Sequence, residues 1–305
     1  MGVNELVVIS GKGGTGKTSV TAALAALVGP AVLTDTDVDG ANLELLLAAD
    51  RRHERRFEGR RKAVIKPSLC AACGRCANEC RFEAVFPAAV RADRGVIMRI
   101  DPDACEGCGL CARVCPADAI VLRKTRGGTW RRSETPCGTL FHARLEPGGE
   151  NSGKLVALLR SEARQHAQEQ GVGLLLTDGP PGSGCPVIAT LTGAQQVLLV
   201  TEPTPSGRSD AERVLDLCRH FRRPAALAIN KCDLHPGMVA QIEGWARERE
   251  LPVVGLLPWD PIVASAVRRG VPAPTLGASP WNTAVANLAD RLGLPRRAAV
   301  PAISQ

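Results

Sequence analysis

Apolar runs alternate with segments of helical spacing in two separate parts of the chain. The first part has strand-like runs at 5–10 and 31–35, with a helix-like segment at 18–29 between them and a short one at 41–48 after them. In the second part, a helix-like segment at 151–170 precedes strand-like runs at 172–178, 195–202, 225–230 and 252–258. This alternation predicts an α/β fold with a mostly parallel sheet and helices on both faces.

The alternation breaks between about 51 and 150, so we interpret this region as an insertion into one α/β domain. The predicted organisation is a discontinuous domain of 1–50 and 151–294, an inserted α+β domain at 60–124, a return connection at 125–150 and a flexible tail at 295–305. The two prolines of the tail argue against an amphipathic helix that would hold a membrane.

Twelve cysteines change this picture. No apolar run approaches the roughly 18 residues that a membrane span needs, and the first ten residues do not resemble a secretory signal. We therefore expect a cytoplasmic protein without membrane contact. Because cytosolic thiols stay reduced, clustered cysteines in such a protein usually bind metal, and eight of the twelve lie between Cys70 and Cys115.

The net charge of the chain is +7, and much of it lies in the run RRHERRFEGRRK from Arg51 to Lys62. Two interpretations of this run stay open. It is either a docking patch for an acidic partner or nucleic acid, or a solvated segment beside a domain junction. We favour the second and expect no nucleic-acid partner.

A glycine-rich loop follows the first predicted strand and opens the first predicted helix. Its residues fit the phosphate-binding pattern G-x-x-x-x-G-K-[ST], and they are Gly11, Lys12, Gly13, Gly14, Thr15, Gly16, Lys17 and Thr18. Glycines let backbone amides surround phosphates, and the helix N-terminus adds a positive dipole end. We expect Lys17 to reach the β- and γ-phosphates and the Thr18 hydroxyl to bind Mg²⁺.

The eight clustered cysteines form the pattern CxxCxxCxxxC twice, the second time followed by Pro116. This is the bacterial ferredoxin arrangement of two [4Fe–4S] clusters, in which the fourth cysteine of each run ligates the other cluster. The arrangement implies that cluster 1 is held by Cys70, Cys73, Cys76 and Cys115, and cluster 2 by Cys105, Cys108, Cys111 and Cys80. The first run departs from the pattern with Arg81 in place of proline, but it lacks no ligand. Zinc is the competing metal, although its sites more often pair two CxxC units across a spacer.

The additional lysine of the loop, Lys12, makes this loop resemble the deviant Walker A loop of the MinD/ParA/Mrp ATPases. In that family the early lysine reaches the nucleotide of a facing subunit, so the resemblance implies an ATP-dependent homodimer. The stretch from Asp35 to Leu43 is similar to switch I of the family, which implies that Asp37 positions the attacking water and that Asp35 lies near the Mg²⁺ shell. Asp178, followed by Gly-Pro-Pro-Gly, looks like Walker B and would hold Mg²⁺ through a water.

The stretch Asn230-Lys-Cys-Asp233 resembles the base-reading N-K-x-D loop. In MinD-like proteins this loop occurs with ATP and its asparagine contacts adenine, so we expect Asn230 and Asp233 to lie at the base of ATP rather than GTP. The implied catalytic residues are Lys12, Lys17, Asp37 and Asp178.

The whole chain is similar to MinD-superfamily ATPases with an inserted ferredoxin domain. Three functions are open. The first is an ATPase whose nucleotide state is coupled to electron transfer with an unidentified redox partner. The second is an iron–sulfur cluster or metal carrier of the Mrp type that serves a client protein, and the third is a ParA-like positioning ATPase. Of the scattered cysteines, we expect Cys137, Cys218 and Cys232 to be structural. For Cys185 we favour a buried structural thiol over a redox thiol near the nucleotide.

Overall fold

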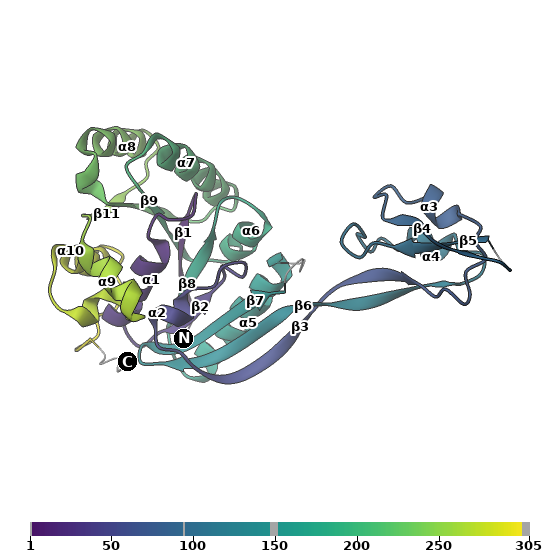
Figure 1. The fold of residues 1–305 in the computed structure, drawn as a ribbon. Coiled ribbons are helices and arrows are strands. Elements are labelled where there is room, and N and C mark those ends of the chain that lie inside the picture. Colours follow the sequence, from purple (N-terminus) through teal and green to yellow (C-terminus); the bar gives the residue numbers. More distant parts are fainter. Residues whose placement is uncertain (1, 94, 147–151, 301–305) are drawn as a thin grey trace. The chain divides into compact units, whose positions relative to one another are not determined.

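The computed structural model describes residues 2–93, 95–146 and 152–300, which fall into two compact units (Figure 1). Unit 1 combines the residues up to Arg55, Trp130–Arg144 and the residues from Ser152 on. Unit 2 extends from Arg56 to Thr129 and includes a short segment that begins at Leu145. Two long strands, β3 and β6, belong in part to each unit, so the units are joined by continuous backbone.

The main sheet has nine strands in the order β11-β10-β9-β1-β8-β2-β7-β6-β3. The strands are β1 (Asn4–Ser10), β2 (Val32–Asp35), β3 (Asp50–Ile65), β6 (Ile120–Thr135), β7 (Gly138–Leu145), β8 (Leu174–Pro181), β9 (Gln196–Thr201), β10 (Ala225–Asn230) and β11 (Val253–Leu257). The six strand pairs from β11 to β7 are all parallel. A two-residue turn joins β6 to β7, and a turn this short requires antiparallel strands.

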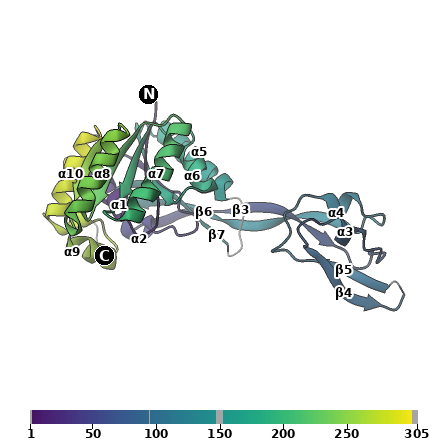
Figure 2. The same cartoon turned by 90° about the horizontal axis from the view of Figure 1, so that it is seen from above.

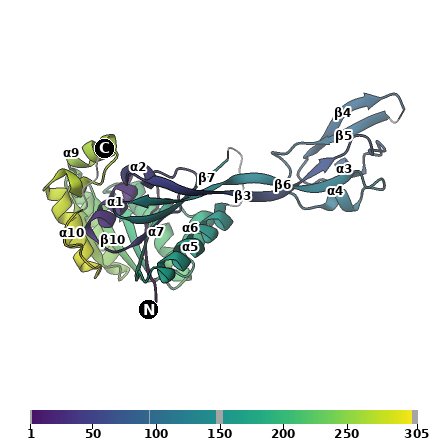
Figure 3. The ribbon, with the colours of Figure 1, turned by 90° about the horizontal axis from the view of Figure 1, so that it is seen from below.

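Helices cover both faces of this sheet, as Figures 2 and 3 show from opposite sides. The helices of unit 1 are α1 (Lys17–Leu27), α2 (Leu43–Leu46), α5 (Ser152–Glu169), α6 (Cys185–Leu191), α7 (Pro205–His220), α8 (Pro236–Glu248), α9 (Pro261–Arg269) and α10 (Pro280–Arg291), with 3₁₀ turns η1 (Cys232–Leu234) and η2 (Ala273–Leu276). None of the described helices is both long and apolar enough to cross a membrane.

Alternate residues of β1 point into two different cores. Leu6 and Val8 pack in the core that includes residues of α1 and α10, whereas Val7 and Ile9 pack in the core that includes residues of α6, α7 and α8. A strand buried on both faces is the reason that the four residues from Leu6 to Ile9 are all apolar rather than alternating. The predicted α/β fold with a mostly parallel, doubly covered sheet is confirmed.

Unit 2 contains the cysteine repeat. Its own elements are α3 (Arg75–Asn78), β4 (Val85–Arg91), β5 (Gly95–Ile100) and α4 (Leu110–Arg113), and β4 pairs with β5 as an antiparallel ladder. The two repeats begin thirty-five residues apart and share unusual backbone conformations. Ala72 and Gly107, then Gly74 and Gly109, then Glu83 and Asp118, all have positive φ. The sequence repeat is therefore also a repeat of structure.

The region between 51 and 150 differs from the sequence prediction at both ends. The predicted return connection at 125–150 contains the end of β6 and all of β7, which are strands of the main sheet. The basic run 51–62 lies in β3, the edge strand of that sheet, and is mostly exposed. Residues 147–151, at the predicted junction with the α/β domain, lie outside the described residues.

The C-terminal tail is held at its beginning. The backbone amide of Arg297 donates a 2.9 Å hydrogen bond to the carbonyl of Leu27, and the backbone of Arg296 forms an isolated antiparallel β-bridge with that of Val28. The guanidinium of Arg297 also donates to three backbone carbonyls. The predicted flexible tail at 295–305 is thus anchored through Arg297, and 301–305 lie outside the described residues.

A buried ion pair joins β1 to α5. Glu5 is fully buried, and its carboxylate accepts hydrogen bonds from Nε and Nη2 of Arg160 at 2.8 and 2.6 Å. Thr177 and Arg164 supply further donors to the same carboxylate. A buried carboxylate that loses its main cation is costly, because its charge stays uncompensated in a low-dielectric interior.

We predict that Arg160→Met lowers the free energy of unfolding by about 3–5 kcal/mol. Arg164→Met is the matched control and should cost less, because the Arg164 side chain is 30% exposed. Adding Glu5→Gln to Arg160→Met should recover part of the loss, since it removes the stranded charge. Urea denaturation of the four proteins measures this, and equal losses for the two arginine variants would contradict the account.

Candidate functional site

The phosphate-binding loop joins β1 to α1 and depends on glycine at two places. Gly16 adopts φ 89°, and a Cβ there would lie 2.3 Å from Nδ2 of Asn230. A Cβ on Gly11 would lie 2.4 Å from the backbone carbon of Asp210. Both positions therefore exclude a side chain, and together they hold the loop against β10 and α7.

Asp178, in β8, is the centre of the site. Its Oδ2 accepts hydrogen bonds from Nζ of Lys17 at 2.9 Å and from Oγ1 of Thr18 at 2.8 Å. Its Oδ1 accepts from Oγ1 of Thr21 at 2.8 Å. The carboxylate is almost completely buried. The predicted Mg²⁺ ligands Thr18 and Asp178 are therefore in direct contact, with the predicted phosphate lysine beside them.

The charge of Lys17 is maintained although its side chain is buried. Burial alone would lower the pKa of Lys17, but the carboxylates of Asp178, Asp35 and Asp37 raise it above its ordinary value. A buried, protonated lysine in a glycine-rich loop is suited to bind a phosphate oxygen. In the same loop, the Thr15 hydroxyl is buried and has no hydrogen-bond partner among the described residues, which fits a loop whose donors serve a ligand.

Asp35 holds the loop that follows β2. Its Oδ1 accepts from the backbone amide of Asp37, and its Oδ2 accepts from the amides of Asn42 and Leu43, all at 3.0 Å. Burial and the nearby charge of Asp178 raise the pKa of Asp35 to about 7. Asp37 lies half-buried in the loop, and burial raises its pKa as well. The structure therefore brings Asp35 and Asp37 to the end of β2, beside Asp178 in the parallel pair β2–β8.

Lys12 is held within its own chain. Its Nζ lies 2.5 Å from Oε1 of Glu202 and donates to the hydroxyls of Thr204 and Ser206. Lys231 also contacts Glu202, at 3.1 Å. Burial alone would raise the pKa of Glu202, but the hydrogen bonds from the two lysines outweigh it and lower the pKa.

The side chain of Asn230 is buried, and its contacts are with protein atoms. Its Nδ2 donates to the carbonyl of Thr15 at 2.8 Å, and its Oδ1 accepts from the indole of Trp281 at 3.2 Å. Asp233 is exposed and accepts from the amide of Trp259. Asn230 thus ties the phosphate loop to β10 and α10, which is a positioning contact.

In unit 2, the eight clustered cysteines separate into the two predicted sets around two small hollows. One hollow is lined by a set from both repeats, Cys70, Cys73, Cys76 and Cys115. The other is lined by Cys80, Cys105, Cys108 and Cys111. The fourth cysteine of each run has therefore crossed to the other set. The backbone amide of Ala119 donates to Sγ of Cys115 at 3.3 Å, as amides near cluster sulfurs do.

These cysteines do not form a single-ion site. Among the described residues, no three histidine, cysteine or acidic side chains are arranged to hold one metal ion. In a [4Fe–4S] cluster each cysteine binds a different iron, so its thiolates stand further apart than the four thiolates around one zinc ion. The grouping therefore matches the two cysteine sets that the sequence predicts.

Comparison with known proteins decides the family. Residues 6–273 match the CobQ/CobB/MinD/ParA nucleotide binding domain. The chain belongs to this family. It is 31% identical over 233 residues to the uncharacterized protein MJ0578 of Methanocaldococcus jannaschii, a match that covers 75% of this chain and 78% of that protein.

Solved structures show the same fold at low sequence identity. The septum site-determining protein MinD of Pyrococcus horikoshii, complexed with Mg-ADP, superposes with a TM-score of 0.54 at 16% identity over 95% of this chain and 96% of that one. A variant of Cyanothece McdA in complex with ATP gives a TM-score of 0.54 at 14% identity over 99% of each chain. The prediction of a MinD/ParA-type P-loop ATPase domain is confirmed, whereas the inserted ferredoxin domain stays a prediction.

Some features of this MinD/ParA-type site were missing from the sequence prediction. Thr21 was not predicted, although it lies one helical turn after Lys17 and Thr18 and therefore on the same face of α1. Glu202 and Lys231 lie in segments that the sequence analysis considered, but their ion pair was not predicted. The two residues follow different strands, β9 and β10, so no local sequence pattern indicates that they pair. Cys185 is exposed, so the favoured prediction of a buried thiol was wrong.

The other scattered cysteines behave differently. Cys137 and Cys218 are buried, and burial raises the pKa of Cys137 to about 11 and that of Cys218 to about 12. Thiols that stay protonated in an apolar setting are unreactive. Cys232 is partly buried, and burial raises its pKa too.

His142 of β7 is buried beside the predicted nucleotide site. It stands opposite Asp35 in the β2–β7 pair, and its Nε2 lies 2.8 Å from the Ser133 hydroxyl. Its Nδ1 lies 3.4 Å from the carboxylate of Glu44. Burial outweighs the attraction of Glu44 and lowers the pKa of His142 to about 4.

We predict that His142 makes the protein lose stability as the pH falls from about 6.5 towards 4. Below its ordinary pKa the unfolded chain binds a proton on His142, whereas the folded chain binds it only near pH 4, so up to about 3 kcal/mol is lost across this window. His142→Gln should lack this part of the pH dependence. Urea denaturation at pH 7 and pH 4.5 tests it, and equal losses in both proteins would contradict the pKa assignment.

Proposed function

We propose that this chain hydrolyses ATP with Mg²⁺ as a homodimer, holds two [4Fe–4S] clusters in unit 2, and couples its nucleotide state to electron transfer. The observation that supports the cluster part most strongly is the separation of eight cysteines into two sets of four around two hollows. The observation that supports the ATP part is the convergence of Lys17 and Thr18 on the buried carboxylate of Asp178.

The roles at the nucleotide follow from these contacts. Thr18 and Asp178 would hold Mg²⁺, and Lys17 would neutralise the β- and γ-phosphates, where charge develops during hydrolysis. Asp37 positions the attacking water, as the resemblance implies. Asp35 shapes the surrounding loop through its three backbone hydrogen bonds. Asn230 supports the phosphate loop, and Asp233 lies exposed in η1, the turn that follows β10.

Lys12 has a role in dimer formation. In the isolated chain it is paired with Glu202, so it must leave this carboxylate to reach the nucleotide of a facing subunit. Glu202 keeps Lys231 as a partner when Lys12 leaves. The departure of Lys12 therefore leaves the carboxylate of Glu202 paired with a cation.

The clusters would be held by the two cysteine sets, and they supply single-electron transfer when bound. The equivalent positive-φ residues of the two repeats, such as Gly74 and Gly109, curve the backbone around each hollow. Arg81, in the place of the expected proline, stacks its guanidinium 4.9 Å from the ring of Phe82.

A set of contacts in unit 1 links the nucleotide loop to the strands that continue into unit 2. Asp35 binds the amide of Leu43, the first residue of α2. The next residue, Glu44, contacts both His142 of β7 and Arg51 of β3, the latter at 3.3 Å. His142 in turn contacts Ser133 of β6. A shift of the loop on ATP binding would thus act on β3 and β6 together.

We predict that anaerobically purified protein contains about eight iron atoms and eight sulfides per chain. Cys73→Ser should lose iron towards half of this value, because it removes a ligand of one set. Cys185→Ser is the matched control, since Cys185 is exposed like Cys73 but lines neither hollow. Iron, sulfide and zinc analysis measures this, and one or two zinc ions per chain with little iron would refute the clusters.

We also predict that the ATPase rate differs between oxidised and reduced protein. Lys17→Ala should abolish hydrolysis in both forms. Glu44→Ala should retain hydrolysis. It should reduce the difference in ATPase rate between the oxidised and the reduced form, because it removes the contacts that connect the loop after β2 to β3 and β7. Phosphate release under anaerobic conditions measures all three proteins, and a rate indifferent to cluster oxidation would reject the coupling.

Two alternatives each have one observation in their favour. Cys73 and Cys108, one from each set, are exposed, which would suit a carrier that hands over a cluster. Transfer of labelled iron from this chain to an acceptor apo-protein, at the rate at which the acceptor gains its cluster, would favour the carrier function. The likeness in fold to a ParA family ATPase of Chlorobium tepidum is consistent with a ParA-like positioning ATPase, and hydrolysis stimulated by DNA would favour this function.

A further inference from the structure

A third hollow of unit 2 lies outside both cysteine sets. Its cavity volume is about 580 Å³, and it is formed by the end of β3, by β5 and by the beginning of β6. Apolar side chains form its floor, among them Val64, Ile65, Ile97, Met98 and Ile100. Val64 is 39% exposed. We refer to this feature as the basic hollow.

The wall of the basic hollow is also the wall of both cysteine sets. Ile65 and Met98 line the basic hollow and the hollow of the set that includes Cys70. Ala63 and Ile100 line the basic hollow and the hollow of the set that includes Cys80. A single layer of side chains thus separates this surface from each predicted cluster, and electron transfer is fastest across the thinnest barrier.

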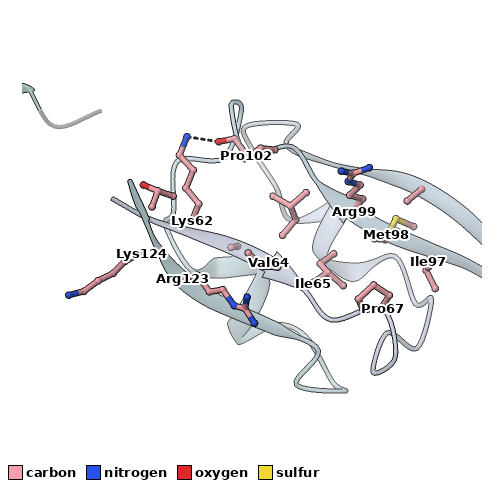
Figure 4. A pocket seen from close by; sticks show the side chains of 14 residues that line it. Lys62, Val64, Ile65, Pro67, Ile97, Met98, Arg99, Pro102, Arg123 and Lys124 are labelled. Carbon is pink, nitrogen blue, oxygen red and sulfur yellow. Dashed lines mark hydrogen bonds between the residues drawn. The ribbon is translucent and has the colours of Figure 1, made fainter. Parts of the chain in front are cut away.

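The rim of the basic hollow is cationic. Arg99 and Arg123 are exposed, and neither pairs with a carboxylate in the part of the chain that the structure describes. Figure 4 shows their guanidinium groups on either side of the apolar residues, with Lys62 turned towards the carbonyl of Pro102 and Lys124 pointing outwards. Lys124 pairs with Glu58, so the two arginines are the charges that remain for a partner.

The strands that form the hollow hold the positive charge of the molecule. β3 and β6 contain twelve lysines and arginines and four acidic residues, an excess of eight against +7 for the whole chain. The rest of the chain is therefore close to neutral. A field concentrated on these strands steers an acidic partner to this part of the molecule.

We propose that the basic hollow is the docking surface for a small acidic one-electron carrier protein. The inference rests on the proposed function, because it assigns the route by which electrons reach the clusters. The reduced carrier loses one electron and a cluster gains it, and no bond forms or breaks. Arg99 and Arg123 meet carboxylates of the carrier, and an apolar side chain of the carrier packs on Val64.

The shape of the hollow favours a protein over a small anion. In sites for small ligands a few polar groups converge on the ligand, whereas here the arginines lie at the rim, on opposite sides of an apolar floor. An apolar centre with a charged rim is the arrangement of a protein interface. Redox encounters use small interfaces of this kind, since fast release matters more than tight binding.

The test uses the full-length, cluster-containing chain and a plant-type ferredoxin, a small acidic [2Fe–2S] protein, as the probe. Arg99→Glu and Arg123→Glu reverse the rim charges, and Val64→Asp places a charge on the apolar floor without altering a residue of either cysteine hollow. Arg126→Glu is the matched control, because Arg126 is exposed on the same strand but does not line the hollow. Calorimetry at about 0.15 M salt measures Kd, and stopped-flow absorbance measures cluster reduction.

We expect Kd to rise on the order of tenfold for each of the three hollow variants and about twofold or less for Arg126→Glu. The rate of cluster reduction should fall in the three hollow variants and change little in Arg126→Glu, while the iron content of all four variants stays that of the unaltered chain. Loss of affinity in Arg126→Glu equal to that in Arg123→Glu would overturn the docking site, and so would the absence of saturable binding to the unaltered chain. Tight binding of flavin mononucleotide in place of the carrier would overturn it as well.

The iron analysis of the same samples separates the two proposals. If the clusters are present and the charge reversals leave Kd unchanged, the docking surface is wrong and the proposed function stands. If the protein contains no clusters, the proposed function fails, and Kd alone decides whether the acidic carrier binds this surface.

Discussion

The carboxylate of Asp178 is the contact on which the nucleotide site depends. It binds α1 through Lys17, Thr18 and Thr21, and its backbone carbonyl accepts both the amide and the hydroxyl of Thr36 after β2 at 2.8 Å. One residue of β8 thus fixes the phosphate loop to the neighbouring strand. In a buried setting each of these bonds is stronger than in water, and an unpaired carboxylate would be costly. Sequence positions 17, 36 and 178 are brought together by this network.

The same network connects the nucleotide site to the strands that unit 1 shares with unit 2. The loop after β2 is closed by Asp35, and α2 follows at once, so Glu44 has little freedom to move independently. Glu44 contacts Arg51 of β3 and His142 of β7, and His142 contacts Ser133 of β6. The two long strands, β3 and β6, are therefore both linked to that loop. Because β3 and β6 belong to both units, this sensitivity needs no contact between the units. Coupling of this kind requires only that ATP favours one arrangement of the loop.

The sequence predicted most of what local chemistry determines. β1, β8, β9 and β10 are buried on both faces and therefore read as apolar runs, and the phosphate loop and the cysteine spacing carry their own signatures. The sequence failed for β3, because an exposed edge strand rich in arginine has no hydrophobic period, and charge on an edge strand prevents pairing with other chains. It also failed for the ion pair of Glu202 with Lys12, since only the fold brings those residues together. Cys185 was misjudged because cysteine is usually buried, whereas here it opens a short helix at the surface.

A redox titration of the clusters with and without Mg-ATP tests most directly whether one chain couples ATP to its clusters. Linkage requires that a cluster state which binds ATP more tightly is stabilised by ATP. We predict that saturating Mg-ATP shifts the midpoint potential, by about 59 mV for each tenfold difference in affinity between the two redox states, and that Lys17→Ala abolishes the shift. Identical potentials with and without Mg-ATP, in protein that binds it, would contradict the account.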